Sequence, residues 1–137
     1  MANKEHVDLI RRDVDAWNTW RAQHPKVKPD LADADLSSAD LMLANLSGAR
    51  LCRANLVLAN LRGADLRKAD LSGANLVGAR LLGVDLVQAK LHGADLSTAE
   101  DLTPEQLEHT TGDMETKLPE GLPYPRRWAV RRGAAGA

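Results

Sequence analysis

A column of leucines recurs at every fifth position through the middle of the chain. It starts at Leu31, ends at Leu96 and marks the centre of fourteen consecutive five-residue blocks over residues 29–98. Alanine stands two positions before the leucine in twelve of these blocks, and the residue between them is mostly Asp or Asn. A short unit repeated at a fixed period is typical of a solenoid, in which each unit buries its apolar face only by stacking on its neighbours.

The period of five constrains the backbone of each block. An α-helix would rotate such a column around its surface, and a flat strand would place successive leucines on opposite faces. The chain must therefore turn once in each block, with the leucine and the alanine pointing inward and the other three residues pointing outward. Glycine is frequent at the last position of the block, where a corner needs unusual backbone angles; it is found at Gly48, Gly63, Gly73, Gly78, Gly83 and Gly93.

The blocks from Ala34 to Thr98, of the form Ala-(Asp/Asn)-Leu-X-X, resemble the pentapeptide-repeat family. This resemblance implies an all-β solenoid, namely a right-handed quadrilateral parallel β-helix with four blocks in each coil. The fourteen blocks would then make about 3.5 coils. The resemblance implies no particular activity, because members of the family share none.

Charge patterning alone does not decide how many blocks make a coil. A stacking distance of twenty residues gives one outward column of alternating charge, made of Asp30, Arg50, Asp70 and Lys90. A distance of fifteen gives an equally alternating column, made of Asp35, Arg50, Asp65, Arg80 and Asp95. We adopt twenty because of the family resemblance, and a three-sided coil is the alternative.

Residues 1–28 are predicted to cap the first coil. Apolar residues at helical spacing predict an amphipathic helix over residues 4–21; they include Val7, Ile10, Val14 and Trp17. Such a helix can cover the open end of a solenoid, which otherwise exposes apolar side chains and unpaired backbone groups. The alternative is a helix that binds a partner or lies on a membrane surface.

The five-residue period breaks after residue 98. Leu102 follows the previous leucine by six residues instead of five. We therefore expect the solenoid to stop there, and residues 99–128 to form a C-terminal cap with an extended segment.

A short helix is predicted within this cap. Thr103 and Gln106 have the spacing of a capping box, and Pro104 takes the first helical position, so the helix should cover residues 104–111. The proline-rich stretch that follows should be extended, and residues 129–137 are expected to be disordered.

The sequence contains no arrangement of residues typical of catalysis or of metal binding. The histidines are far apart and have no cysteine or acidic partner at metal-ligand spacing; they are His6, His24, His92 and His109. There is also no glycine-rich phosphate loop and no nucleophile elbow. We therefore expect no enzymatic activity, no cofactor, no metal and no small-molecule substrate.

Cysteine use and hydropathy indicate the compartment. Cys52 is the only cysteine, so no internal disulfide can form, which is typical of proteins of reducing compartments. We predict that Cys52 is an exposed small residue at an outward position. The first fifteen residues lack the apolar core of a signal peptide, and no apolar run is long enough to span a bilayer. The expected location is the cytoplasm, with no membrane contact. The family resemblance implies a bacterial source.

A scaffold for protein–protein interaction is the preferred functional hypothesis. With twenty-residue stacking, outward apolar side chains from two neighbouring sides of the coil should form one patch around a corner, and such patches mark contact sites. This candidate interface, for an unidentified protein partner or a second copy of the chain, consists of Met42, Leu43, Val57, Leu58, Val77 and Leu82.

The alternative hypothesis is a DNA-mimicking protein that binds and protects a topoisomerase such as gyrase, as some members of the resembled family do. Mimicry needs a sustained negative surface, because phosphate charge dominates binding by DNA partners. Residues 29–98 contain eight Asp, no Glu and seven Lys or Arg, so the repeats carry almost no net charge. The mimic is therefore disfavoured, and binding of nucleic acid itself is not expected.

Overall fold

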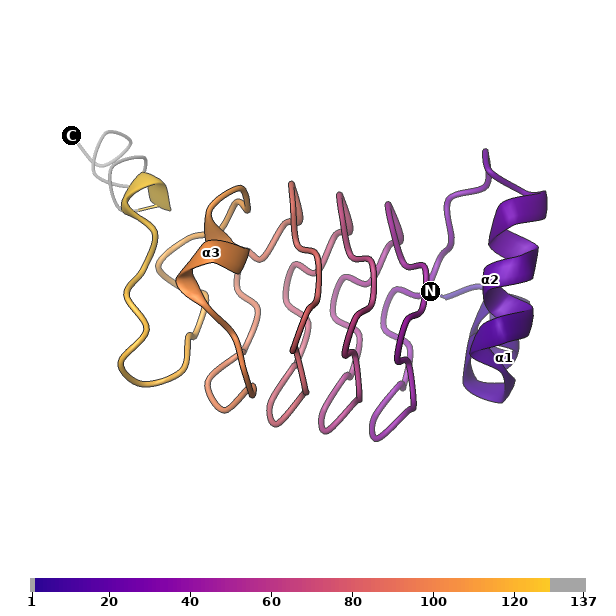
Figure 1. The fold of residues 1–137 in the computed structure, drawn as a ribbon, viewed down its shortest axis with the longest axis horizontal. Helices are drawn as coiled ribbons and strands as arrows, with labels where there is room; N and C mark the ends of the chain where they lie inside the picture. The colour runs from indigo at the N-terminus through magenta and orange to yellow at the C-terminus, as the bar shows by residue number, and fades with distance from the viewer. Residues whose placement is uncertain (1, 129–137) are drawn as a thin grey trace.

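The computed structural model of the protein describes residues 2–128. Its centre is a rod of stacked coils, with two helices at one end and a short helix followed by an irregular segment at the other (Figure 1). Eleven parallel bridges join residues that are twenty positions apart, from Asp30 with Arg50 to Arg80 with Glu100. Each coil therefore contains four blocks, and the three-sided alternative is excluded.

The sides of the coils are too short to be regular strands. Within residues 2–128, each side pairs with the next coil through a single bridging residue, so the parallel ladder of the predicted β-helix is present without regular strands. The reason is the turn in every block; the amide of Ala34, for example, donates to the carbonyl oxygen of Leu31 at 3.1 Å. Because this turn occupies most of a five-residue block, one residue is left to form the bridge.

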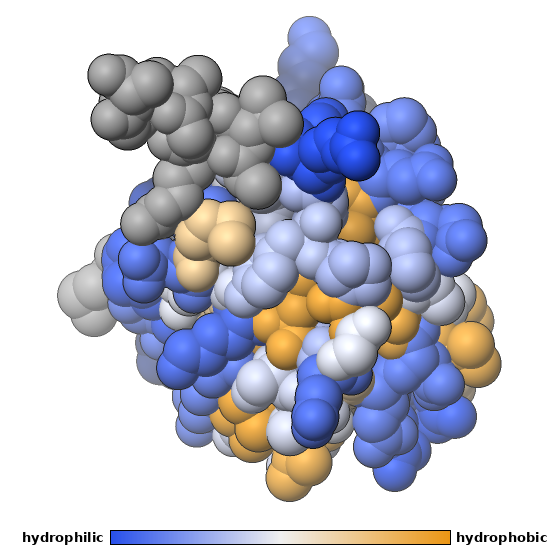
Figure 2. Space-filling model, turned by 90° about the vertical axis from the view of Figure 1, so that its left-hand side faces the viewer, coloured by the Kyte–Doolittle hydropathy of each residue, from blue (hydrophilic) through white to orange (hydrophobic). Residues whose placement is uncertain are grey.

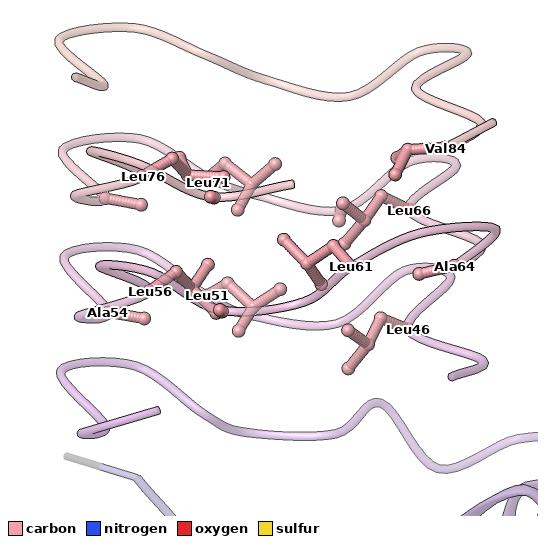
Figure 3. Packing of buried hydrophobic residues seen from close by; sticks show 14 of the residues in the cluster. Leu46, Leu51, Ala54, Leu56, Leu61, Ala64, Leu66, Leu71, Leu76 and Val84 are labelled. Carbon is pink, nitrogen blue, oxygen red and sulfur yellow. The ribbon is translucent and has the colours of Figure 1, made fainter. Parts of the chain in front are cut away.

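The leucine column fills the interior of the rod. Each of its leucines is no more than 3% exposed, and the alanines two positions before them are buried as well. Figure 3 shows Leu56 directly below Leu76, and Ala64 below Val84, which replaces alanine in its block. The predicted inward pair is confirmed, because each inward side chain packs against the one twenty residues away in the next coil.

The Asp and Asn residues brace the corners of the coils. In eleven blocks the side-chain Oδ1 of this residue accepts a hydrogen bond from the amide two positions further on, as Asp35 does from Ser37 at 3.1 Å. The last residue of thirteen blocks has a φ between 57° and 72°. Glycine adopts this region without steric cost, which explains its frequency at the position.

Two helices precede the rod instead of the single helix predicted over residues 4–21. They are α1 (Lys4–Arg12) and α2 (Val14–Gln23). The chain breaks at Asp13, whose backbone is extended and whose side chain accepts a hydrogen bond from the amide of Asp15 at 2.9 Å. A side chain that caps the free amides of a first turn starts a new helix, although the apolar spacing continues across the break.

Both helices are hydrogen-bonded to the first coil. Arg11 of α1 donates to the carbonyl oxygen of Asp35 at 2.7 Å. Trp17 of α2 is fully buried, and its indole Nε1 donates to the carbonyl oxygen of Asn45 at 2.9 Å. The two helices therefore lie over the beginning of the rod, as Figure 1 shows.

At the other end, α3 (Pro104–Leu107) is shorter than the helix predicted over residues 104–111. It has the predicted capping box between Thr103 and Gln106. Leu107 is buried in the core cluster, so the short helix contributes to the C-terminal packing of the rod.

The ladder of backbone bridges continues beyond the break in the sequence period. Lys90 bridges to Thr111 and Asp95 bridges to Lys117, with the insertion of α3 widening the offset between partners. The prediction that the solenoid stops at Leu102 is therefore wrong for the backbone. Figure 2 views this end of the rod and shows an apolar centre surrounded by hydrophilic residues. The predicted disorder of residues 129–137 concerns a segment outside the described residues.

Cys52 is buried, at 8% exposure, although the sequence predicts an exposed residue. Its neighbours at the same corner, one coil away on either side, are Ala32 and Ser72. Both have small side chains, which allows adjacent coils to cover the thiol. Burial at this position therefore depends on residues twenty positions away.

Candidate protein interface

The six predicted interface residues lie on two neighbouring corners of the rod. Leu43, Leu58 and Leu82 are 66%, 62% and 57% exposed, more than any other large apolar side chain of the described residues. Met42 is exposed to a smaller extent, whereas Val57 and Val77 are half-buried. Most of the exposed apolar surface of these corners therefore comes from three leucines.

Polar residues divide the six side chains into two groups, which we call the apolar columns. One column contains Val57, Leu58 and Val77, and the other contains Met42, Leu43 and Leu82. The side of the coil between them carries Asp40, Asn60 and Arg80. Arg62 also interrupts the second column, where its Nε donates to Asn60 Oδ1 at 3.0 Å. The structure thus brings the residues onto adjacent corners but not into one continuous patch.

Two of the leucines lie along the rod over a glycine of the next coil. A Cβ atom built on Gly63 would be 2.7 Å from Leu43 Cδ2, and a Cβ atom built on Gly78 would be 2.7 Å from Leu58 Cδ2. The leucines also have positive φ angles of 65° and 60°. Thirteen of the fourteen blocks have a positive φ at this position, so the backbone conformation belongs to the repeat. What distinguishes Leu43 and Leu58 is a large apolar side chain that is exposed to solvent, which favours a role in recognition.

The N-terminal helices reach the second apolar column, a contact that the sequence did not indicate. Asn18 of α2 donates from Nδ2 to the carbonyl oxygen of Leu43 at 3.1 Å, and its Oδ1 accepts from the amide of Asn45 at 2.8 Å. A groove runs between the junction of the helices and this column; its apolar lining is Ile10, Val14, Met42 and Leu43. Asn18 thus fixes the backbone from which Leu43 projects.

Carboxylates of the rod are held by arginines and by the turns. Arg53 donates from Nε and Nη2 to the two carboxylate oxygens of Asp33 at 2.8 and 2.9 Å, and this pairing lowers the pKa of Asp33. Arg67 pairs in the same way with Asp65 and lowers the pKa of that carboxyl. Opposite charges are therefore interspersed at these corners.

Within residues 2–128, no three His, Cys, Asp or Glu side chains lie together in a way that could hold a metal ion. None of the helices in this range has the length and apolar character needed to cross a bilayer.

Comparisons with known proteins show which family the repeats represent. The family model described as "Pentapeptide repeats" matches eight copies, over residues 29–57 and 64–99. Among solved structures, the pentapeptide repeat protein Rfr23 from the cyanobacterium Cyanothece 51142 is 35% identical, with a TM-score of 0.57, over 68% of this chain and 67% of that chain. The chain belongs to the pentapeptide repeat family.

Pentapeptide repeat proteins fold as right-handed β-helix solenoids, in agreement with the stacked coils described above. Another member, alr5209 from Nostoc Pcc 7120, is 32% identical with a TM-score of 0.39, over 77% of this chain and 86% of that chain. QnrB1, a plasmid-mediated fluoroquinolone resistance protein, is 21% identical with a TM-score of 0.40, over 80% and 72% of the two chains. A likeness at this level carries no argument about function. A comparison with curated proteins finds no match.

Proposed function

We propose that this pentapeptide repeat protein is a non-enzymatic scaffold of the bacterial cytoplasm that binds another protein, or a second copy of itself, through the apolar columns. The exposure of Leu43, Leu58 and Leu82 on two adjacent corners carries the proposal. The free energy falls when a partner covers large apolar side chains that are otherwise in contact with water, so their exposure favours binding.

The rigidity of the coil supports this assignment. Ladder hydrogen bonds hold each corner to the next coil, as between the amide of Leu58 and the carbonyl oxygen of Val77 at 2.9 Å. Side chains at the corners are thus presented at a fixed spacing before any partner arrives. Preorganised contacts lose less conformational entropy on binding, so a few leucines can contribute most of the affinity.

The test compares a double variant of the apolar columns with a control variant outside them. The control residue occupies the same position of its block as Leu82 does in the preceding block. Leu82 belongs to an apolar column, whereas Val87 is exposed on the next corner, outside both columns. Leu82→Asp combined with Leu58→Asp should abolish self-association measured by light scattering, or capture of the partner from the native cell. Val87→Asp should leave the complex intact. Asp is compatible with the backbone at residue 58, because Asp33 has a φ of 62° at the same block position.

Loss of the complex in all variants, or in none, would remove the apolar columns as the binding surface. Thermal unfolding of each variant provides the control for folding, because Leu58, Leu82 and Val87 all lie on the surface. Both the double variant and the Val87→Asp control should unfold within a few degrees of the native chain, since surface substitutions change stability by about 0.5 kcal/mol or less each.

A DNA-mimicking topoisomerase-binding protein is the alternative proposal. It has less support, because eight Asp in residues 29–98 are nearly balanced by seven Lys or Arg. Some of these carboxylates are also paired; Arg50 lies 3.0 Å from Asp30, for example. A gyrase supercoiling assay separates the two proposals. Inhibition, or protection of the enzyme from a quinolone, would support the mimic, and an unchanged reaction at micromolar protein would exclude it.

A further inference from the structure

A second surface, separate from the apolar columns, lies where α2 connects to the first coil. The segment after α2 and one corner of the rod line an open groove of about 640 Å³. Its cationic lining residues, which define what we call the basic groove, are Arg21, Lys26, Lys28, Arg67 and Lys68. A groove of this size falls within the range of small-molecule sites in proteins.

The charge of the basic groove is positive. No carboxylate is among its lining residues. Within residues 2–128, the side chains of Lys26, Lys28 and Lys68 are exposed, and their ammonium groups make no hydrogen bond or ion pair. Arg67 is different, because it is paired with Asp65 at 2.6 Å and lies 3.8 Å from Asp85.

One acidic group near the groove offsets part of this charge. Burial raises the pKa of Asp70, but hydrogen bonds from Ser72, and then the ammonium groups of Lys90 and Lys28, lower it. Three unpaired ammonium groups around one hollow repel one another. An anion bound between them would relieve this repulsion.

Arg21 gives the groove a buried charge. It is 9% exposed, and burial lowers its pKa. Its Nη1 and Nη2 donate to the carbonyl oxygens of Asn45 and Ser47, each at 3.0 Å, but its Nε is buried without a hydrogen-bond partner. The carboxylate of Asp65 offsets part of the effect of burial on Arg21. The buried Nε still lacks a partner, so a nearby anion would stabilise the guanidinium further.

The groove also has apolar walls. Val27, on the segment after α2, is 39% exposed, and Val87, on the corner of the rod, is 41% exposed. Both line the groove. A bare inorganic anion would leave these side chains in water, whereas an anion that carries an organic group would cover them.

We propose that the basic groove binds a small phosphate ester, with the phosphate between Lys26, Lys28 and Lys68 and the organic group against Val27 and Val87. Phosphate is favoured because a dianion can accept from several ammonium groups, and lysine commonly binds it as a point charge. A long nucleic acid is disfavoured, because Asp residues on the neighbouring sides of the coils interrupt any continuous basic track. The sequence alone predicted no small-molecule substrate; a bound phosphate ester would be a ligand that the protein does not convert.

Titration calorimetry of the full chain with three probes tests this proposal. Phenyl phosphate should bind with a single site, inorganic phosphate should bind about tenfold more weakly because it lacks the organic group, and phenol should not bind. Chemical shifts of the backbone amides of Gly48 and Val27, measured in the same titration, locate the site. Tight binding of phenol alone, equal binding of the two phosphates, or shifts that avoid the groove would each overturn the proposal.

A matched pair of double variants tests the named side chains. Lys26→Gln with Lys68→Gln should weaken binding of phenyl phosphate about tenfold or more, since two charge-assisted contacts are lost. Gln fits the backbone of residue 68, because Gln88 has the same φ of 63° one coil further on. Lys4→Gln with Arg12→Gln removes the same charge from α1 and should leave affinity unchanged. An equal loss in both variants, or tighter binding of duplex DNA than of phenyl phosphate, would contradict the proposal.

Discussion

Trp17 and Asn45 join the N-terminal helices to the rod. The indole Nε1 of Trp17 donates to the carbonyl oxygen of Asn45 at 2.9 Å, although the two residues are 28 positions apart in sequence. The side chain of Trp17 is fully buried. The same carbonyl oxygen accepts from Arg21. This contact fixes α2 over the coil and also holds Arg21 in the wall of the basic groove.

Trp17→Phe should destabilise the protein by about 1 to 3 kcal/mol, because it removes a buried hydrogen bond and part of a buried ring. The free energy of unfolding, measured with urea, checks this value. Trp20→Phe is the control, because Trp20 is half-buried and its side chain makes no hydrogen bond in the described residues. A smaller effect at Trp17 than at Trp20 would contradict the role of Trp17 as the main anchor of α2.

His6 should make the stability of this end depend on pH. Its Nδ1 accepts a hydrogen bond from the amide of Asp30 at 3.1 Å, and its ring lies between 4.9 and 6.3 Å from the rings of Trp20 and Trp17. Burial lowers the pKa of His6, an effect that Asp30 and Glu5 partly offset and Arg21 reinforces.

A histidine with a lowered folded pKa stabilises the fold in its neutral form. This contribution is complete above the unfolded value of 6.5 and is lost as the pH falls through the folded pKa. The urea midpoint should therefore fall between pH 7.5 and 5.5 in the native chain and fall less in His6→Gln. His92→Gln controls for the substitution itself. A native chain whose midpoint is constant over this range would refute the prediction.

Gly63→Ala should be more destabilising than Gly48→Ala. Both glycines have a positive φ, 69° and 67°, so each substitution should cost about 1 kcal/mol or more through the backbone. Of these two glycines, Gly63 has the side chain of Leu43 over it, whereas a Cβ on Gly48 would meet nothing within 4 Å. The difference in unfolding free energy should shrink when Leu43→Ala is added. Equal effects of the two substitutions would show that Leu43 moves aside freely.

Gln106 should anchor the C-terminal end. Its Nε2 donates to the carbonyl oxygens of Leu81 and Val84 at 2.9 and 3.1 Å, and its Oε1 accepts from the amide of Thr103 at 2.8 Å. Gln106→Ala should lower the unfolding free energy by about 1 to 3 kcal/mol, because these backbone groups lose their partner. Glu105→Ala, at an exposed position of the same helix, should have little effect.

The interior of the rod could be predicted from the sequence, and the surface only in part. A leucine at every fifth position specifies its own burial, because its neighbours in the next coil are leucines too. The identity of Cys52 does not predict its own burial in this way. Its burial depends on Ala32 and Ser72, which become its neighbours only when the coils stack. The break between α1 and α2 was missed because Asp13 interrupts the backbone but not the apolar spacing.

The candidate surfaces show the same limit. Leu43, Leu58 and Leu82 are exposed, as predicted. Their separation by Asn60 and Arg62 was not predicted, because it follows from side chains in different coils. The basic groove was not predicted at all. Its lining residues come from α2, from the segment after it and from three blocks of the rod, so no local sequence pattern indicates that they meet.

Side-chain footprinting of the free protein and of its isolated complex tests the central proposal most directly. Carbene labelling reports the exposure of individual side chains, and Leu43, Leu58 and Leu82 should lose labelling when the complex forms, while Val87 and Met114 keep theirs. All five are exposed in the free chain. Unchanged labelling of the three leucines, with protection at Val87 or Met114 instead, would contradict the assignment of the apolar columns as the binding surface.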